Sequence, residues 1–346
     1  MRRTARSTRL RRRPLGAIVS GHMISRRGFL TGSVTLLAAP LAAGAQQARK
    51  VYRIGFLGES RLSSSETREF RDQLRRLGWV EGEHISVEFR FADGSFDRLP
   101  ALAAELVRLG VDVIVARATP ATKAAQQATT TIPIVFTAVA DPIRVGLVPS
   151  LAHPGGNITG FTTGSVELSG KRLELLKAAV PHLTRVAVFI NPTNPQAPFL
   201  RKDTEAAAAS LSLALKFVDA AKVAEVPTAF AKIRSEADAL LPDPLIGSRS
   251  AQAQIAELAF KNRLPSMERN RSFAEVGGLM TYGANPDELL RESVGYVDKI
   301  LRGAKPAELP VQRATKFELV INLKTAKALG LTIPPSLLLR ADQVIE

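Results

Sequence analysis

The chain has 346 residues, 45% of them apolar, no cysteine and a formal net charge of +15. The apolar fraction is that of a globular protein, and the lack of cysteine excludes both a disulfide framework and a lipid anchor attached through cysteine. The first 45 residues hold nine arginines and no acidic residue, so without them the charge falls to +6. No basic stripe interleaved with aromatic residues remains, so nucleic acid is not an expected partner.

The N-terminal segment has the features of an export signal. Arg26-Arg27 precedes an apolar run from Val34 to Ala43, which ends in the small residues Ala43-Gly44-Ala45. This order is typical of a twin-arginine (Tat) signal peptide cleaved before Gln46. The run is shorter than the roughly 20 apolar residues of a membrane span. We therefore expect a periplasmic protein that is soluble, carries no lipid and does not insert into the membrane.

The start of the chain leaves two alternatives open. Met23 stands directly before the Ser-Arg-Arg segment and would give a signal of ordinary length. We therefore take residues 1–22 as an upstream extension, and residues 1–45 together as extension and signal peptide. A genuine basic arm that begins at Met1 is the alternative.

From Val51 onward, short apolar runs alternate with longer amphipathic segments. Strands are predicted at 51–57, 84–91, 111–116, 132–139, 158–161, 185–190, 215–218, 237–241, 279–282 and 315–322. Helices are predicted at 65–77, 97–109, 168–180, 199–211, 228–235, 251–262 and 287–301. Such alternation is typical of parallel sheets covered by helices on both faces. Because a Pro/Gly-rich segment at 154–160 separates two series, we predict an α/β protein of two doubly wound lobes with a cleft between them.

Pairs of a small polar residue and proline recur after the predicted strands. Thr, Asp and Asn favour helix N-caps, and proline favours the first helical position, so each pair predicts a helix start. Helix starts that follow parallel strands gather at the carboxyl edge of a sheet, where open α/β proteins bind ligands. The pairs are Thr119-Pro120, Asp141-Pro142, Asn191-Pro192, Asp243-Pro244 and Asn285-Pro286.

These positions supply candidates for ligand binding. Thr119 with the backbone amides of Ala121 and Thr122 is the best candidate for an anion, because helix N-termini attract negative charge. Asp141 or Asp243 would balance a ligand ammonium group. Three aromatic residues near strand ends are candidates for contact with an apolar ligand group, although such residues are more often core. They are Phe136, Phe161 and Tyr282.

Signals of catalysis are weak. Beyond residue 45 the histidines are His84, His153 and His182, which have no metal-ligand spacing, and no cysteine accompanies them. Neither a Gly-x-Ser-x-Gly elbow nor a Gly-x-x-x-x-Gly-Lys phosphate loop occurs. We therefore predict no catalytic residue, no metal site and no cofactor.

Several motifs in chain order carry a family resemblance. They are Arg53-Ile54-Gly55-Phe56-Leu57, Leu77-Gly78-Trp79-Val80-Glu81-Gly82, Ile132-Pro133-Ile134-Val135-Phe136, His153-Pro154-Gly155-Gly156-Asn157-Ile158-Thr159-Gly160, Gly277-Gly278-Leu279-Met280-Thr281-Tyr282-Gly283, and the tail from Thr315-Lys316-Phe317-Glu318 to Pro334-Pro335. With them, the chain beyond the signal resembles the ABC-transporter substrate-binding proteins related to tryptophan- and tyrosine-binding ones.

The resemblance implies a periplasmic binding protein of type I, with two lobes joined by a three-crossover hinge. Lobe 1 would comprise 46–160 and 284–316, and lobe 2 would comprise 161–283 and 317–346. The hinge would lie near 159–162, 283–284 and 315–317. The ligand-lining loops would be Glu59-Ser60, 118–121, 137–141, Asn191 to Asn194, Asp243 and Tyr282, which add Ser60, Thr137, Asn191 and Asn194 to the candidates above.

Two features depart from the family pattern. The segment from Ala237 to Asp243 is about two residues short, which puts a ligand role for Asp243 in doubt. Arg117 replaces a small residue before Thr119-Pro120, where it would either grip a second ligand carboxylate or point to solvent. We favour solvent, because long charged side chains are usually exposed.

The predicted function is the solute-binding component of an ABC importer. It would bind an amino acid or related carboxylate in the cleft and deliver it to a permease in the inner membrane, as a monomer and without catalysis. One alternative is an exported periplasmic enzyme, since twin-arginine export often serves folded cofactor enzymes. The other is a receptor that reports the ligand to a membrane sensor protein.

Overall fold

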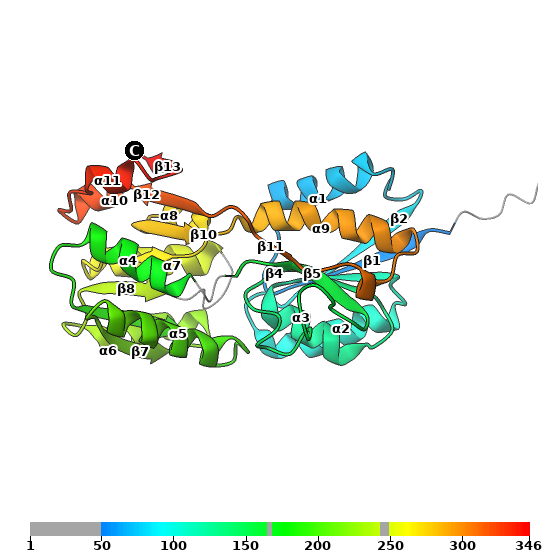
Figure 1. The fold of residues 1–346 in the computed structure, drawn as a ribbon, viewed down its shortest axis with the longest axis horizontal. Helices are drawn as coiled ribbons and strands as arrows, with labels where there is room; N and C mark the ends of the chain where they lie inside the picture. The colour runs from blue at the N-terminus through cyan, green and yellow to red at the C-terminus, as the bar shows by residue number, and fades with distance from the viewer. Residues whose placement is uncertain (1–49, 165–167, 243–248) are drawn as a thin grey trace, which may run out of the picture. The chain divides into compact units, whose positions relative to one another are not determined.

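The computed structural model describes residues 50–164, 168–242 and 249–346. The predicted extension and signal peptide lie outside these residues, and so does Asp243. The chain from Arg49 onward forms one compact unit, and its strands form two sheets covered by helices (Figure 1).

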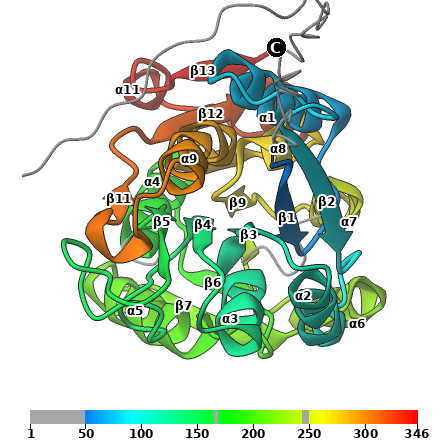
Figure 2. The ribbon, with the colours of Figure 1, turned by 90° about the vertical axis from the view of Figure 1, so that its right-hand side faces the viewer.

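The first sheet has six parallel strands in the order β11-β5-β4-β3-β1-β2. Figure 2 shows β5, β4, β3, β1 and β2 side by side. Their bounds are β1 Tyr52–Gly58, β2 Ile85–Phe91, β3 Val113–Arg117, β4 Ile134–Val139, β5 Ile158–Thr162 and β11 Gln312–Arg313.

Helices cover both faces of this sheet because successive strand residues point to opposite faces. Ile54, Phe56 and Val115 pack under α1 (Ser64–Arg76) and α9 (Pro286–Leu301). Leu57, Ile114 and the alternate positions of β4 pack against α2 (Leu99–Arg108) and α3 (Ala118–Ala128). Figure 1 shows α1 and α9 above the strands and α2 and α3 below them. The apolar faces are thereby sealed, and polar groups gather at the strand ends.

The second sheet joins a three-stranded and a four-stranded sheet. The first part has the order β7-β6-β8 and the second β9-β10-β12-β13, and a parallel bridge between Leu240 and Ser266 connects them. The strands are β6 Arg185–Ile190, β7 Ala214–Asp219, β8 Ala239–Pro242, β9 Met267–Glu268, β10 Met280–Gly283, β12 Glu318–Asn322 and β13 Gln343–Ile345.

Two apolar clusters sandwich this sheet as well. Val186 and Leu241 pack with α4, α5, α10 and α11, and Phe189 and Leu240 pack with α6, α7 and α8. The helices are α4 Ser169–Ala179, α5 Ala197–Ser210, α6 Val226–Ile233, α7 Arg249–Lys261, α8 Arg271–Glu275, α10 Leu323–Ala328 and α11 Pro335–Leu338. Short 3₁₀ turns cover Phe96–Arg98, Val223–Glu225 and Pro306–Glu308. Within the three described ranges, no helix combines the length and the hydropathy that a membrane crossing requires.

The chain passes between the two sheets three times. It leaves the first sheet after β5, returns after β10 to form α9, and leaves again between β11 and β12. The predicted class of parallel sheets covered by helices is confirmed. Two strands differ, because β13 runs parallel to β12 and β12 runs antiparallel to β10. Strand β12 enters the second sheet directly from the first, so it starts at the edge where the parallel strands end.

The predicted elements match the observed ones in order, with ends shifted by up to about three residues. Short elements were missed, namely β9, α8, β11, α10, α11 and β13. Two- and three-residue strands leave no periodicity to detect. The helix α3 was expected only as a helix start at Thr119.

Asp238 joins the starts of β6 and β8. Its carboxylate accepts hydrogen bonds from Arg185 Nη2 at 2.6 Å, Arg185 N at 2.9 Å and Thr184 Oγ1 at 2.9 Å. The Arg185 guanidinium is the main reason why the pKa of Asp238 is lowered from 3.8 to about 2. This carboxylate therefore stabilises the second sheet while it is ionised.

We predict that Asp238→Asn lowers the free energy of unfolding at pH 7 by about 1 kcal/mol, since solvent screening reduces the effect of the full pKa shift. A lowered pKa contributes stability above the unfolded value of about 4 and loses it as the pH falls towards 2. Urea titrations at pH 7, 4 and 3 should show the difference from wild type shrinking as the pH falls. A difference that stays constant would contradict this account.

Candidate functional site

A small cavity lies where strands of both sheets end. Its volume is about 80 Å³, and we call it the inner cavity. The first sheet contributes residues that follow β1, β3 and β5, and the second sheet contributes residues that follow β9 and β10. The lining residues are Glu59, Ser60, Arg117, Ala118, Ala138, Thr163, Arg269, Asn270, Ala284 and Pro286.

A larger groove adjoins the inner cavity and shares Ser60, Arg117 and Asn270 with it. This outer groove has a volume of about 670 Å³. It runs along the start of α1, the start of α9 and the segment around α8. Its other lining residues are Arg61, Leu62, Ser63, Ser65, Glu66, Arg249, Gln252, Arg271, Ser272, Glu275, Asn285 and Asp287.

Two alanines in the inner cavity have left-handed backbone. Ala118, which follows β3, has φ +67°, and Ala138 near the end of β4 has φ +57°. At Ala138 the pairing of β4 with β5 also shifts register between Phe136 and Val139. Non-glycine residues rarely adopt this conformation, and such strain is concentrated at functional sites. Because their side chains are single methyl groups, these alanines leave room for the cavity.

Arg117 is held between two carboxylates at the boundary of cavity and groove. Its Nη1 donates to Glu66 Oε1 at 2.7 Å, and its Nη2 lies 3.9 Å from Asp287 Oδ1. The Arg117 side chain is only 20% exposed. The expectation that this guanidinium points to solvent was therefore wrong. Glu66 in the first turn of α1 supplies a counter-charge that periodicity in the sequence does not reveal.

The two carboxylates respond differently to this environment. Although burial opposes ionisation of Glu66, the charge of Arg117 and hydrogen bonds from Ser63 leave its pKa below the ordinary value. Desolvation and then the repulsion from Glu66 raise the pKa of Asp287 from 3.8 to about 6. The Asp287 side chain is nevertheless 59% exposed, at the first turn of α9. The Arg117 guanidinium is thus the shared counter-charge of Glu66 and Asp287.

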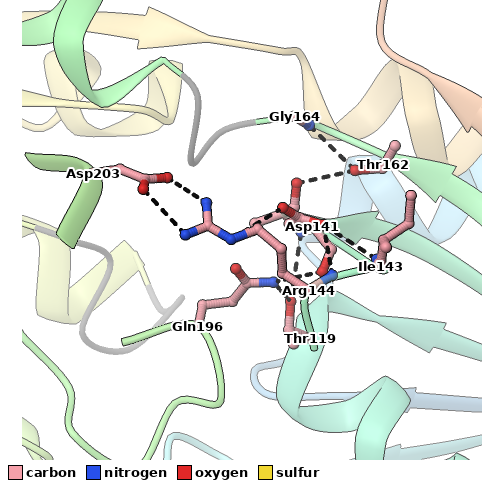
Figure 3. Close-up of polar contacts among 9 residues, drawn as sticks. Thr119, Asp141, Ile143, Arg144, Thr162, Gly164, Gln196 and Asp203 are labelled. Atoms are coloured by element: carbon pink, nitrogen blue, oxygen red, sulfur yellow. Dashed lines mark hydrogen bonds and ion pairs between the residues drawn. The ribbon is translucent and has the colours of Figure 1, made fainter. Parts of the chain in front are cut away.

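A second polar cluster links the two sheets near Thr119 (Figure 3). Gln196, just before α5 of the second sheet, donates from Nε2 to Thr119 Oγ1 at 3.2 Å and to the Asp141 carbonyl at 3.4 Å. Since a carbonyl only accepts, the second contact fixes the orientation of the amide. Thr119 and Gln196 are both buried, at 3% and 4% exposure.

Beside this cluster, Arg144 bonds across to α5 (Figure 3). Its Nη1 lies 2.5 Å from Asp203 Oδ2 and its Nη2 lies 3.1 Å from Oδ1, which is a bidentate pair. The guanidinium also lies 4.6 Å from the centre of the Phe199 ring. Asp141 orients this turn, because its Oδ1 accepts from the amides of Ile143 and Arg144 at 3.2 and 3.0 Å.

The predicted candidates from the first sheet occupy different surroundings. Ser60 lines both the inner cavity and the outer groove. Ala121 of α3 packs in the core, and Thr122 donates to the carbonyl of Ala118 at 2.7 Å. Thr137 is fully buried, and its Oγ1 has no hydrogen-bond partner among the described residues. Ligand contact by these residues, and by Thr119 and Asp141, stays a prediction.

The candidates from the second sheet lie apart from the inner cavity. Asn191 accepts from the amide of Thr193 at 3.0 Å, and Asn194 accepts from the amide of Gln196 at 3.0 Å. Tyr282 packs on the apolar core with its ring 6.2 Å from that of Phe317. None of these three residues is among those that line the cavity or the groove, and Asp243 lies outside the described residues.

The polar–proline pairs are mostly not helix caps. Asn285 is one, since it accepts from the amides of Asp287 and Glu288 before α9. Asp141 and Asn191 instead cap turns, because their side chains bond amides two or three residues on with no helix starting there. At the Thr119 pair the helix already begins at Ala118, and Thr119 makes no capping bond.

Sequence reasoning expected the second sheet to contribute, but it did not name Arg269 and Asn270, which line the inner cavity. Arg269 and Asn270 follow the two-residue strand β9, which gave no strand signal. Gly283 is the one sequence signal of this arrangement that we find, because a Cβ there would lie 2.3 Å from the Arg269 carbonyl oxygen. The glycine lets β10 pass close to that backbone.

The site offers paired charges, hydroxyls and amides. Among the described residues, no group of three or more histidine, aspartate or glutamate side chains is arranged to hold a metal ion. The arrangement can bind a polar molecule between the ends of two sheets.

We predict that Asp287→Asn changes the pH dependence of stability. A carboxyl whose pKa is raised to about 6 favours the folded state less as the pH rises from about 4 to 6. The stability of wild type relative to the variant should therefore fall over this range, by less than about 1 kcal/mol because Asp287 is largely exposed. Denaturant titrations of both proteins at pH 4.5 and 7.5 measure this change. An unchanged difference would refute the raised pKa.

Comparison with known proteins gives consistent results. Residues 61–345 match the family model described as ABC transporter substrate binding protein. A protein of Clostridioides difficile (strain R20291) named tyrosine-binding protein is 28% identical over 264 residues, which are 76% of this chain and 75% of that protein.

Two crystal structures share the fold over most of the chain. A conserved domain protein from Vibrio cholerae O1 biovar eltor is 29% identical with a TM-score of 0.78, covering 85% of this chain and 100% of that one. An ABC domain in complex with L-Trp from Streptococcus pneumonia is 26% identical with a TM-score of 0.77, covering 86% and 100%. These likenesses agree with the predicted type I binding fold, and this chain belongs to the family of ABC transporter substrate-binding proteins.

Proposed function

We propose that this protein is the solute-binding component of an ABC importer, which captures an amino acid or related carboxylate in the inner cavity and outer groove. The observation that carries this proposal is the convergence of strand ends from both sheets on one cavity with paired charges. Open α/β proteins bind ligands at such edges. The relatives named for tyrosine binding and solved with L-Trp make an amino acid the leading class.

In this proposal the two sheets are two lobes that close on the ligand. Lobe 1 comprises residues 46–160 and 284–316, and lobe 2 comprises residues 161–283 and 317–346, so the first boundary falls inside β5, whose last two residues still pair with the first sheet. The three chain passages near 159–162, 283–284 and 315–317 serve as the hinge. A ligand that touches Arg117 of lobe 1 and Asn270 of lobe 2 would favour closure, because only a difference in affinity between the two states shifts their balance.

The proposal extends to place and partner. A Tat-exported chain of this family would act in the periplasm as a monomer and pass its ligand to a permease in the inner membrane. The family and the relatives are substrate-binding proteins, which supports a role without catalysis. A sensor role would use the same cleft, and loss of ligand uptake on deletion of the gene would separate transport from sensing.

We predict that one compound class stabilises the purified protein in a thermal-shift screen of the twenty amino acids and small carboxylates. A ligand that binds only the folded state adds about 2.7 kcal/mol at a hundredfold excess over its dissociation constant. Arg269→Leu should reduce this shift, whereas Arg201→Ala, in an exposed ion pair with Asp219, should not. A flat screen with a cooperatively melting protein would contradict the proposal.

We also predict that the Arg144–Asp203 pair stabilises the closed arrangement. Arg144→Ala should weaken every ligand by a similar factor, up to about tenfold, because it shifts the open–closed balance without touching the ligand. Small-angle X-ray scattering should show a larger radius of gyration for the ligand-free variant.

Arg201→Ala is the matched control for this variant. Arg201 likewise pairs with an aspartate and lies 4.2 Å from an aromatic ring, that of Phe217, but all these partners belong to the second sheet. Equal effects of the two variants on affinity and radius would argue against a closing role for Arg144.

A further inference from the structure

We infer that the ligand of this cleft is a small polar molecule, with a carboxylate and a second charged or hydrogen-bonding group, and that aromatic amino acids are poor ligands. This inference rests on the proposed function and narrows its ligand class. It departs from the ligands that the relatives' descriptions give, so it depends on the residues of this chain alone.

The first observation is the composition of the inner cavity wall. Glu59 and Arg117 face it from the first sheet, and Arg269 and Asn270 face it from the second. The rest of the wall consists of small side chains, three alanines among them. A ligand enclosed here meets charges and amides at both ends, in a space of about 80 Å³.

The second observation is that the polar character continues outward. Along the outer groove the lining includes Ser63, Ser65 and Ser272, and the amides of Gln252 and Asn285. Hydroxyl and amide groups donate and accept, so they can bind either a charged or a neutral polar group of the ligand. Among the described residues of this wall, Leu62 is the one large apolar side chain.

The free-energy cost of removing water from this wall then distinguishes aromatic ligands from polar ones. An aromatic side chain buries about 150–250 Å² of apolar surface. Against this wall it would remove water from polar groups such as Arg117 and Asn270 and offer them no hydrogen bond in exchange, which is costly. A polar ligand supplies the lost hydrogen bonds itself.

The aromatic residues of this region have other contacts. Tyr282 packs with Phe317, and Phe161 lies 4.8 Å from Tyr296 between ring centres. No aromatic residue is among the described residues that line the cavity and the groove. The sequence of the two internal segments outside the description, 165–167 and 243–248, contains none either.

The test is isothermal titration calorimetry of the purified protein with two sets of compounds. The polar set is L-aspartate, L-glutamate, L-asparagine, L-glutamine, L-serine and succinate, and the aromatic set is L-tryptophan, L-tyrosine and L-phenylalanine. We expect at least one polar compound to bind 100-fold or more tightly than each aromatic one. An aromatic amino acid that binds as tightly as the best polar compound overturns the inference and leaves the proposed function standing. If no compound binds a protein that melts cooperatively, the proposed function fails and the inference with it.

Two variants locate the binding in the inner cavity. Ala284→Leu fills part of the cavity and Arg269→Leu removes a charge from its wall, so each should weaken the best polar ligand at least tenfold. Ala209→Leu adds the same side chain on the exposed surface of α5 and should leave the affinity unchanged. If Ala284→Leu or Arg269→Leu melts like wild type and binds with wild-type affinity, the cavity is not the ligand site and the inference is overturned.

Discussion

Parallel strands that carry helices on both faces leave polar groups little room except at the ends of the strands. Both sheets of this protein obey that constraint, with apolar clusters on each face. The chain crosses between the sheets three times, and the residues after β1, β3, β9 and β10 come to line one cavity. The position of the site thus follows from how the apolar surface is buried, and its chemistry depends on the few residues that end each strand.

This constraint explains why the fold could be predicted well from the sequence. Strands such as β1 and β6 are buried on both faces, so they appear as short apolar runs between amphipathic helices. The elements that escaped prediction are those whose existence depends on neighbours. The strand β9 has two residues and exists because Met267 and Glu268 pair with β10. Its absence from the prediction also removed Arg269 and Asn270 from the expected site.

The polar residues of the site were harder to predict, for a different physical reason. A side chain such as Arg117 is placed by a partner far away in the sequence, here Glu66, and nothing local distinguishes it from a solvent-exposed arginine. Likewise Asp141 and Asn191 were expected before helices, but their side chains satisfy turns. Capping preferences describe which amides a short polar side chain can reach, and turns offer the same amides as helices do.

Closure and selectivity would reside in different residues of this protein. Arg144 and Asp203 line neither the inner cavity nor the outer groove, yet they join the two sheets. A contact of this kind changes the cost of opening by the same amount whatever is bound, so it scales all affinities together. The charged wall of the inner cavity would act on differences between ligands, because each ligand would replace the lost water to a different extent. Substitutions of Arg144 or Asp203 would therefore change the affinity for all ligands alike, and substitutions in the wall of the inner cavity would change which solute is carried.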